Sequence, residues 1–445
     1  MNLQSKEFFV LALLITYVAY VVFKTARHSS DSDQLVPKIG TWWGVSAGLF
    51  TLFGGGEIVT LSSLGYLYGW AAVSLVVGYS ISFAVLGFMV SKIDPSRLSG
   101  FVSLPDFIGS NFGNISKHLT FVVSFAAFFA LLVLQFTVGG SLLSEFSGLN
   151  YNLIIAVIGA TTCSYLLFGR YRAVQITDQI QGIAMLALGI AMLIALEMAD
   201  SPSGEVTKRA TSSMPSEMFI SLVVTGLFVA ASSADVWQRL CAATSPKSQR
   251  LGGVLGGLGL LLLGIVFTAA GVIARKLLGD SADPNTIINA LVSSSLGPIG
   301  SYIALALATC AILATADTEI FLLASMSAKI VCFDNKGDSN GRSPGRLLPW
   351  LLIGVSIAAC CMAVWTRDAA KVYTWILMLI VALAPATLAA LFGQKSRWGL
   401  LIIGVPLTAI LILGPLGFVT LETIYLVPSV ALLVTLLLGC RHAAK

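Results

Sequence analysis

Two distant segments of the chain repeat one pattern of apolar, small and acidic residues. Residues 48–58 read GLFTLFGGGEI, and residues 226–236 read GLFVAASSADV. The run Gly54–Gly56 aligns with small residues in the second segment, and Glu57 aligns with Asp235. Both segments lie inside long apolar stretches, where small residues weaken a helix and a carboxylate is costly. An interrupted helix with a buried acid in each half is typical of secondary transporters built from repeats, and chance similarity of two helices is the alternative.

The composition indicates an all-α polytopic membrane protein. The chain is 57% hydrophobic and 11% charged, against about 45–50% and about 25% in soluble domains. A helix needs about 20 apolar residues to cross a bilayer. Thirteen segments of about this length are predicted, at residues 7–23, 43–65, 67–91, 119–139, 150–169, 175–197, 217–238, 252–274, 302–328, 348–365, 372–392, 398–416 and 420–439.

The positive charges predict the orientation of the chain in the membrane. With the N-terminus outside, 19 of the 26 Lys and Arg residues, Arg239 among them, fall in inner loops or ends. Seven, among them Lys208 and Arg275, fall on the other side. This bias follows the positive-inside rule and places the C-terminus in the cytoplasm. The net charge of +5 therefore reflects membrane topology and does not call for a nucleic-acid partner.

The offset between the two matching segments predicts an inverted repeat. They are the first and sixth of ten core helices, and an odd offset of five turns the second copy over in the membrane. We expect a five-plus-five core with residues 43–197 as the first repeat and 198–392 as the second. Residues 1–42 then supply an extra N-terminal helix, and residues 393–445 supply two extra C-terminal helices with a short inner tail.

The interrupted helices and the ninth predicted span offer oxygen ligands for a cation. Unwinding at Gly54–Gly56 frees backbone carbonyls, although close helix packing is the alternative use of small residues. In the ninth span, Ala311, Thr315 and Thr318 share one helical face, and Asp317 and Glu319 flank it. Such ligands suit Na⁺, or a proton relay if the carboxylates titrate.

Other polar residues in apolar spans complete the candidate sites. Asp178 lies at the inner end of the sixth span, where it is either an ion ligand or a helix cap. Gln135 is a lone polar residue in the fourth span, and such residues also bond helix to helix. Trp237 lies near the predicted inner boundary, where an anchoring role is equally compatible. The predicted substrate-binding set is Phe53, Gly55, Glu57, Gln135, Ser232, Ser233, Asp235 and Trp237.

Five motifs in order resemble those of the sodium/solute symporter family, which includes sodium/proline, sodium/glucose and choline transporters. They are GLFTLFGGGEIV, SLPDFIGSNFG, ITDQIQG, DVWQRLCAATSPKSQR and ATADTEIFLLASMSAKI, spread over roughly residues 40–340. The resemblance implies a five-plus-five inverted repeat and ion-driven uptake by alternating access. Glu57 and Leu52 stand where choline transporters would have aromatic residues, so the comparison implies no substrate.

The resemblance also implies a sodium site. Its ligands would be the backbone carbonyls of Thr51, Gly54 and Ala311, together with hydroxyl groups on the ninth span. Family members commonly offer two adjacent hydroxyls there, and this chain has Ala314 followed by Thr315. One hydroxyl ligand is missing, which favours compensation by Asp178 and Asp317 or coupling to protons. The predicted ion-binding set is Thr51, Gly54, Asp178, Ala311, Thr315, Asp317 and Thr318.

The sequence therefore predicts a Na⁺-coupled symporter of a small polar organic solute, located in the cell membrane. The two acids of the repeat favour an amino acid or another amine. The alternatives are a proton-coupled symporter of the same fold and a transporter-like solute sensor acting through a partner. No nucleophile–base pair, nucleotide loop or metal-binding spacing supports an enzyme, and no cofactor beyond Na⁺ or H⁺ is expected. The sequence does not predict the oligomeric state.

Overall fold

The computed structural model describes most of the chain, in segments separated by short gaps. It describes residues 16–25, 35–94, 96–98, 100–198, 213–279, 287–288, 290–291, 298–334, 344–366, 369–393, 399–420 and 422–443. Within these ranges the protein consists of helices, turns and a single isolated bridge between Gly40 and Ala243. The predicted all-α class is confirmed for this part of the chain.

Most helices overlap the predicted apolar segments, and α5 (Leu104–Phe112) is a helix that no predicted segment contains. The first half contains α2 (Trp42–Phe50), α3 (Gly55–Tyr68), the short 3₁₀ helix η1 (Gly69–Val73), α4 (Ser74–Val90), α5 (Leu104–Phe112), α6 (Asn114–Ser147) and α7 (Tyr151–Glu197). The second half contains α8 (Ser216–Ser232), α9 (Ala234–Ala242), α10 (Pro246–Leu278), α12 (Pro298–Asp334), α13 (Pro344–Trp365), α14 (Ala369–Val381), α15 (Ala384–Leu391), α16 (Gly399–Leu413) and α17 (Leu426–Ala443).

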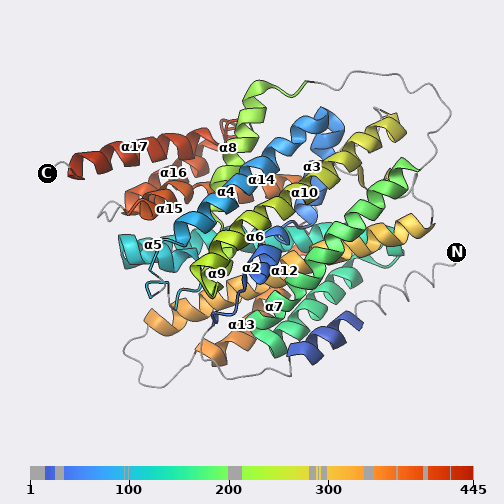
Figure 1. The fold of residues 1–445 in the computed structure, drawn as a ribbon, viewed down its shortest axis with the longest axis horizontal. Helices are drawn as coiled ribbons and strands as arrows, with labels where there is room; N and C mark the ends of the chain where they lie inside the picture. The colour runs from blue at the N-terminus through green and yellow to red at the C-terminus, as the bar shows by residue number, and fades with distance from the viewer. Residues whose placement is uncertain are drawn as a thin grey trace.

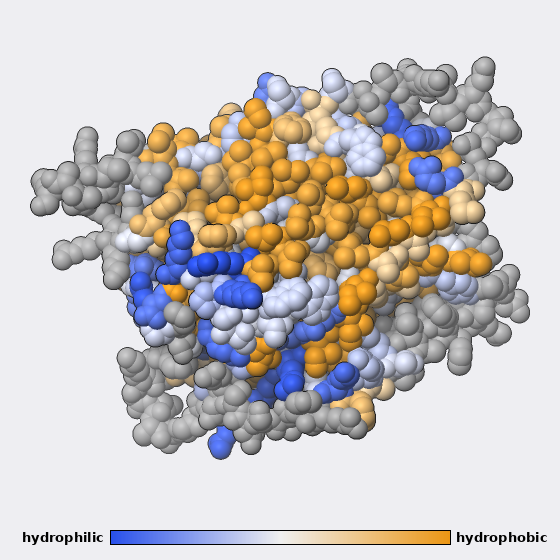
Figure 2. All heavy atoms as spheres, viewed as in Figure 1, coloured by the Kyte–Doolittle hydropathy of each residue, from blue (hydrophilic) through white to orange (hydrophobic). Residues whose placement is uncertain are grey.

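Several of these helices are long and apolar enough to cross a membrane. Among the described residues there are six, or seven when the bent pair α8–α9 is taken as one span. The predicted total of thirteen and the five-plus-five repeat stay predictions. Residues 16–25 are helical, and residues 7–15 of the first predicted span lie outside the described residues. Figure 2 shows a broad apolar surface on one face of the molecule.

Both predicted helix interruptions are present, and the first lies earlier than expected. Residues Thr51–Gly54 separate α2 from α3, and the helix has already resumed at Gly55 and Gly56. Gly54 is the N-cap of α3, so the glycine run begins a helix where we expected it to interrupt one. In the second half, Ser233 separates α8 from α9, and the two helices are bent by 51°.

Two further breaks divide other helices. Arg170 in α7 has a φ of 48°, and it lies in the gap between the predicted spans 150–169 and 175–197. Residues 382–383 separate α14 from α15, which divides a segment predicted as one span, 372–392. Pro385 lies in the first turn of α15, where its missing N–H costs no helical hydrogen bond. This proline explains why a new helix starts there.

Helix α10 packs against the broken pair α2–α3 and against α4, whereas α15, α16 and α17 gather beside the C-terminus (Figure 1). Small residues allow the close approach of α10. A Cβ atom on Gly271 would collide with the backbone carbonyl oxygen of Ser62 in α3. Gly253 approaches α4 in the same way, since a Cβ atom there would lie 2.5 Å from the carbonyl oxygen of Phe83. Membrane helices use such residues because packing, not water exclusion, holds them together.

We predict that Gly271→Ala destabilises the protein. The added methyl group would press against the backbone of α3, which cannot move aside as a side chain can. Overpacking of this kind costs about 1–3 kcal/mol. The thermal unfolding midpoint in detergent should fall. Gly354→Ala in α13 is the matched control, because no neighbour among the described residues lies within 4 Å of the place that its Cβ atom would take. The control midpoint should stay or rise, since alanine favours a helix by about 1 kcal/mol over glycine. Equal midpoints for both variants would contradict the packing argument.

Candidate functional site

A cavity of about 50 Å³ lies between the two helix breaks. This volume accommodates a few water molecules. Four residues of the predicted substrate-binding set line it, namely Phe53, Glu57, Ser233 and Asp235. The rest of the lining is Leu52, Leu61, Leu75, Val76, Tyr79, Phe83, Leu131, Val229, Val236, Leu260, Ile376, Leu377 and Ile380. The cavity is therefore apolar apart from two acids, one serine and one tyrosine.

The two repeated acids begin the two resumed helices. An Oε atom of Glu57 accepts a hydrogen bond of 2.9 Å from the backbone N–H of Gly54. Asp235 accepts hydrogen bonds from the N–H of Val236 at 2.7 Å and from the Ser233 hydroxyl at 2.5 Å. The first turn of a helix leaves N–H groups unpaired and carries partial positive charge. Both carboxylates are thus held at the cavity wall by the backbone that the helix breaks expose.

Gln135 of α6 supports the first break from the side. Its Oε1 accepts a hydrogen bond of 2.8 Å from the N–H of Gly55. A Cβ atom on Gly54 would lie 2.5 Å from both Gln135 Nε2 and Thr315 Oγ1. A larger residue at position 54 would therefore have to displace side chains of α6 and α12. The structure thus brings two residues of the predicted ion-binding set, Gly54 and Thr315, next to two of the predicted substrate-binding set, Gly55 and Gln135.

On α12, the Thr315 hydroxyl donates a hydrogen bond of 2.9 Å to the carbonyl oxygen of Ala311. Both residues are buried. Ala311 and Thr315 thus present their oxygens on one face of α12, as the sequence predicted. Because a Cβ atom on Gly54 would lie 2.5 Å from Thr315 Oγ1, the first break packs directly against this part of α12.

Asp178 joins the first break to a buried arginine. One carboxylate oxygen of Asp178 accepts a hydrogen bond of 2.9 Å from the Thr51 hydroxyl. The other oxygen lies 3.0 Å from Nη2 of Arg239, and both side chains are about 2% exposed. Asp178 lies well inside α7, beyond the break at Arg170, so the alternative role as a helix cap is wrong. Its partner is a guanidinium from the second broken helix.

Arg239 was expected in an inner loop, and that expectation is wrong. The residue belongs to α9 and is buried against α2, since a Cβ atom on Gly48 would lie 2.5 Å from its Nε. Its Nη2 also donates a hydrogen bond of 2.6 Å to the Thr318 hydroxyl. Arg239 therefore does not count among the positive charges of the inner loops. The remaining bias still favours the predicted orientation.

Asp317 of α12 faces α7. Its Oδ2 accepts hydrogen bonds from the Tyr165 hydroxyl at 2.8 Å and from the Thr177 hydroxyl at 2.7 Å. The neighbouring Thr318 contacts Arg239. The polar network therefore runs from Thr51 through Asp178, Arg239 and Thr318 to Asp317. Four of the seven predicted ion-binding residues belong to it.

Four predicted substrate-binding residues do not line the cavity. Gly55 and Gln135 meet at the first break, and Ser232 and Trp237 contact other helices. The Ser232 hydroxyl donates to the carbonyl oxygens of Phe228 at 2.6 Å and Ile380 at 2.9 Å. Trp237 is fully buried, donates through Nε1 to the Ala231 carbonyl at 2.9 Å, and stacks on Phe107 of α5 at 4.2 Å. Burial on all sides rules out the alternative of an interfacial anchor. Both side chains hold helices together.

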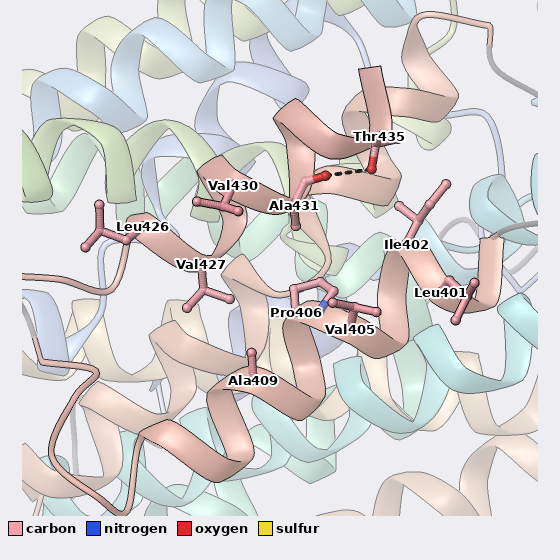
Figure 3. Close-up of a pocket in the computed structure, with 10 residues that line it drawn as sticks. All are labelled: Leu401, Ile402, Val405, Pro406, Ala409, Leu426, Val427, Val430, Ala431 and Thr435. Atoms are coloured by element: carbon pink, nitrogen blue, oxygen red, sulfur yellow. Dashed lines mark hydrogen bonds between the residues drawn. The ribbon is translucent and has the colours of Figure 1, made fainter. Parts of the chain in front are cut away.

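A larger cavity lies between α16 and α17, with a volume of about 500 Å³ (Figure 3). Its lining consists of aliphatic side chains and Thr435, whose hydroxyl donates to the Ala431 carbonyl at 2.7 Å. A solute site needs a few convergent polar groups to orient its ligand. This cavity lacks them, so the smaller one between the helix breaks is the candidate site.

Sequence reasoning missed Arg239 and Tyr79 as residues of the site. Arg239 falls four residues after Asp235, so one turn of α9 carries both charges inward. This spacing could have indicated a buried Arg239, but the predicted span 217–238 ends one residue before it. Tyr79 lies within a wholly apolar-looking span, and nothing in its neighbourhood distinguished it.

We predict that Asp178→Asn destabilises the protein strongly. Removal of one partner leaves Arg239 buried and unpaired, which costs about 3–5 kcal/mol. The thermal midpoint should fall, and the double variant Asp178→Asn/Arg239→Gln should lose less than the two single variants added together. Arg97→Gln, at an exposed arginine, serves as the control and should leave the midpoint unchanged. Additive losses in the double variant would show that the two side chains do not interact.

Solved structures of membrane transporters share this fold. A Na⁺-coupled sialic acid symporter, in a substrate-bound outward-open state, superposes with a TM-score of 0.82 and 15% identity, covering 96% of this chain and 95% of that one. Mhp1, a nucleobase-cation-symport-1 family transporter in a closed conformation with bromovinylhydantoin bound, gives a TM-score of 0.64 and 16% identity, over 91% and 94%. At these identities the likeness shows the fold alone.

Curated relatives are transporters and not enzymes. Sodium/proline symporter 2 of Staphylococcus saprophyticus is 25% identical over 339 residues, covering 70% of this chain and 65% of that protein. The sodium/pantothenate symporter of Haemophilus influenzae is 24% identical over 282 residues, covering 59% and 57%. The match thus spans less than two thirds of either relative. The sequence pattern of the sodium:solute symporter family matches residues 39–393, a range that contains both helix breaks and the cavity. The chain belongs to this family.

Proposed function

We propose that the protein is a Na⁺-coupled symporter of a small polar organic solute bearing an ammonium group. The observation that carries the proposal is the cavity between the two helix breaks, with Glu57 and Asp235 in its wall. Transporters of repeat architecture bind solute and ion where broken helices expose backbone groups. The solute would bind between α3 and α9, and alternating access would carry it across the cell membrane.

The cluster around Thr315 supports Na⁺ as the coupling ion. Thr315 Oγ1 lies against Gly54, and the Ala311 carbonyl lies on the same face of α12. Carbonyl and hydroxyl oxygens are ligands that hard cations prefer. Asp178 is already paired with Arg239, so the proposed ion site depends on the hydroxyl of Thr315 and on the carbonyls of Thr51, Gly54 and Ala311. The N-terminus would face outwards and the C-terminus the cytoplasm.

The two acids support an ammonium-bearing solute. Both carboxylates already accept backbone hydrogen bonds, which reduces but does not remove the cost of burying two like charges near one cavity. An ammonium group between them would offset that cost and supply three donors. The relatives named for proline and pantothenate carry different solutes, so the acids of this chain are the stronger guide.

The direct test is uptake into proteoliposomes. A thermal-shift screen of amino acids and amines, with and without Na⁺, selects the solute, because ligand binding raises apparent stability by mass action. Radiolabelled solute should then accumulate only under an inward Na⁺ gradient. A solute that binds but does not accumulate would support the alternative of a sensor. Accumulation that ignores Na⁺ and follows a pH gradient would support proton coupling.

We predict that Thr315→Ala weakens Na⁺ coupling. The change removes the hydroxyl beside Gly54, so the half-saturating Na⁺ concentration should rise about tenfold, as expected for the loss of about 1.4 kcal/mol, while maximal uptake changes little. Thr309→Ala is the matched control, since Thr309 is also buried on α12 and donates to its own helix at Leu305. An unchanged Na⁺ dependence in Thr315→Ala would exclude this ligand.

We predict that Glu57→Gln weakens binding of the amine while the protein still folds. The glutamine oxygen can still accept from the Gly54 N–H, so the start of α3 is preserved. A hydrogen bond to a charged group is worth about 1.5–3 kcal/mol. Because about 1.4 kcal/mol corresponds to a factor of ten in affinity, loss of the charge should raise the half-saturating amine concentration at least tenfold. Glu217→Gln, at an exposed acid of α8, should leave it unchanged. Tight binding of a carboxylate without an amine group would sink this proposal.

A further inference from the structure

An amino acid and a simple amine differ by one carboxylate, and the cavity between the helix breaks distinguishes the two. Its polar lining consists of the acids Glu57 and Asp235 and the neutral residues Ser233 and Tyr79. All its other lining side chains are aliphatic or phenylalanine. A solute carboxylate would be a third negative group in this apolar space. It would need a cation or several N–H donors to offset its loss of water.

The backbone N–H groups at the first break already donate to oxygen atoms of the protein. The N–H of Gly54 donates to Glu57 at 2.9 Å, and the N–H of Gly55 donates to Gln135 at 2.8 Å. In transporters with broken helices, N–H groups at such helix starts point at anionic groups of the substrate. Here side chains of the protein take the place that a substrate carboxylate would need.

The second break is occupied in the same way. The N–H of Val236 donates to Asp235 at 2.7 Å, and the Ser233 hydroxyl donates to the same carboxylate oxygen at 2.5 Å. The hydroxyl proton of Ser233 is therefore directed at an acid and away from a solute. Both helix starts thus present acceptors to the cavity, and acceptors suit a solute that donates hydrogen bonds.

Positive charge lies outside the cavity. No lysine, arginine or histidine among the described residues lines it. Arg239 of α9 is not part of the lining, and its Nη2 is engaged by Asp178 and Thr318. Thr315 of the proposed Na⁺ site is not part of the lining either. Neither the guanidinium nor the coupling ion is therefore placed to bind a carboxylate in the cavity.

We propose that the solute is a small amine without a carboxylate. Its ammonium group binds at Glu57 and Asp235, with the Tyr79 hydroxyl as a further acceptor, and its hydrocarbon part packs on the apolar lining. The cavity of about 50 Å³ limits that part to a few carbon atoms. The inference rests on the proposed function, from which it takes the ammonium group and the site, and it decides between an amino acid and an amine.

Matched ligands on the purified wild-type protein test the inference. Pyrrolidine is proline without its carboxylate, and methylamine is glycine without its carboxylate. Both amines are protonated at neutral pH. Thermal-shift titrations in Na⁺ buffer give a half-saturating concentration for each compound. For the amine that binds better, this concentration should be lower than for its amino acid by a factor of about ten or more, because the carboxylate meets two like charges.

The outcomes separate the inference from the proposed function. An amino acid that binds as tightly as its amine would overturn the inference and leave the ammonium-bearing solute intact. Cyclopentanecarboxylate, which is proline with carbon in place of the ring nitrogen, tests the proposed function itself. Tighter binding of this carboxylate than of pyrrolidine would overturn both. A protein that no amine of the set stabilises would also contradict the inference.

Asp235→Asn provides a second measurement on the same pair of ligands. The asparagine oxygen can still accept from the N–H of Val236 and from the Ser233 hydroxyl, so the start of α9 is preserved. Loss of one cavity charge should reduce the preference for pyrrolidine over proline by a factor of about ten. Glu217→Gln, at the exposed acid of α8, should leave the preference unchanged. An unchanged preference in Asp235→Asn would contradict the role of this acid, and the wild-type titrations decide the inference if the variant does not fold.

Discussion

The structure depends on satisfying the backbone groups that two helix breaks leave open. A membrane offers no water to those groups, so an interrupted helix persists only where the protein supplies partners. At the first break the partners are Gln135 and Glu57, which accept from Gly55 and Gly54. At the second, Asp235 accepts from Val236. Gln135, Glu57 and Asp235 therefore stabilise the breaks by accepting hydrogen bonds from the open backbone N–H groups. The cavity lies where the two breaks leave space between the helices.

A buried ion pair links the first break to the second broken helix. The first break is linked through Thr51 to Asp178 and then to Arg239 of the second broken helix. A buried pair of this kind contributes little net stability, whereas an unpaired member is costly. The pair therefore fixes the relative position of α2, α7 and α9. Any cation that approaches Asp178 has to compete with a guanidinium that the chain itself provides.

The sequence was sufficient for the all-α class and for the presence of one interruption in each half, because hydropathy and small-residue runs are local signals. It also identified Glu57 and Asp235, since the repeat aligned them. It misplaced the first interruption by a few residues, because glycines that look like helix breakers serve as the start of α3. Arg239 was assigned to a loop, and Asp178 was left as a cap or a ligand. Only the packing of α9 against α2 and α7 reveals that these two charges meet, and no single-span pattern contains that contact.

The bridge between Gly40 and Ala243 has a mechanical consequence. The N–H of Gly40 donates to the Ala242 carbonyl at 3.0 Å, and the N–H of Thr244 donates to the Gly40 carbonyl at 2.9 Å. The segment before α2 is thus joined to the segment after α9 by two backbone hydrogen bonds, so the start of the first broken helix and the end of the second form one unit. A rearrangement that tilts one of these helices must carry the other with it, or break both backbone hydrogen bonds.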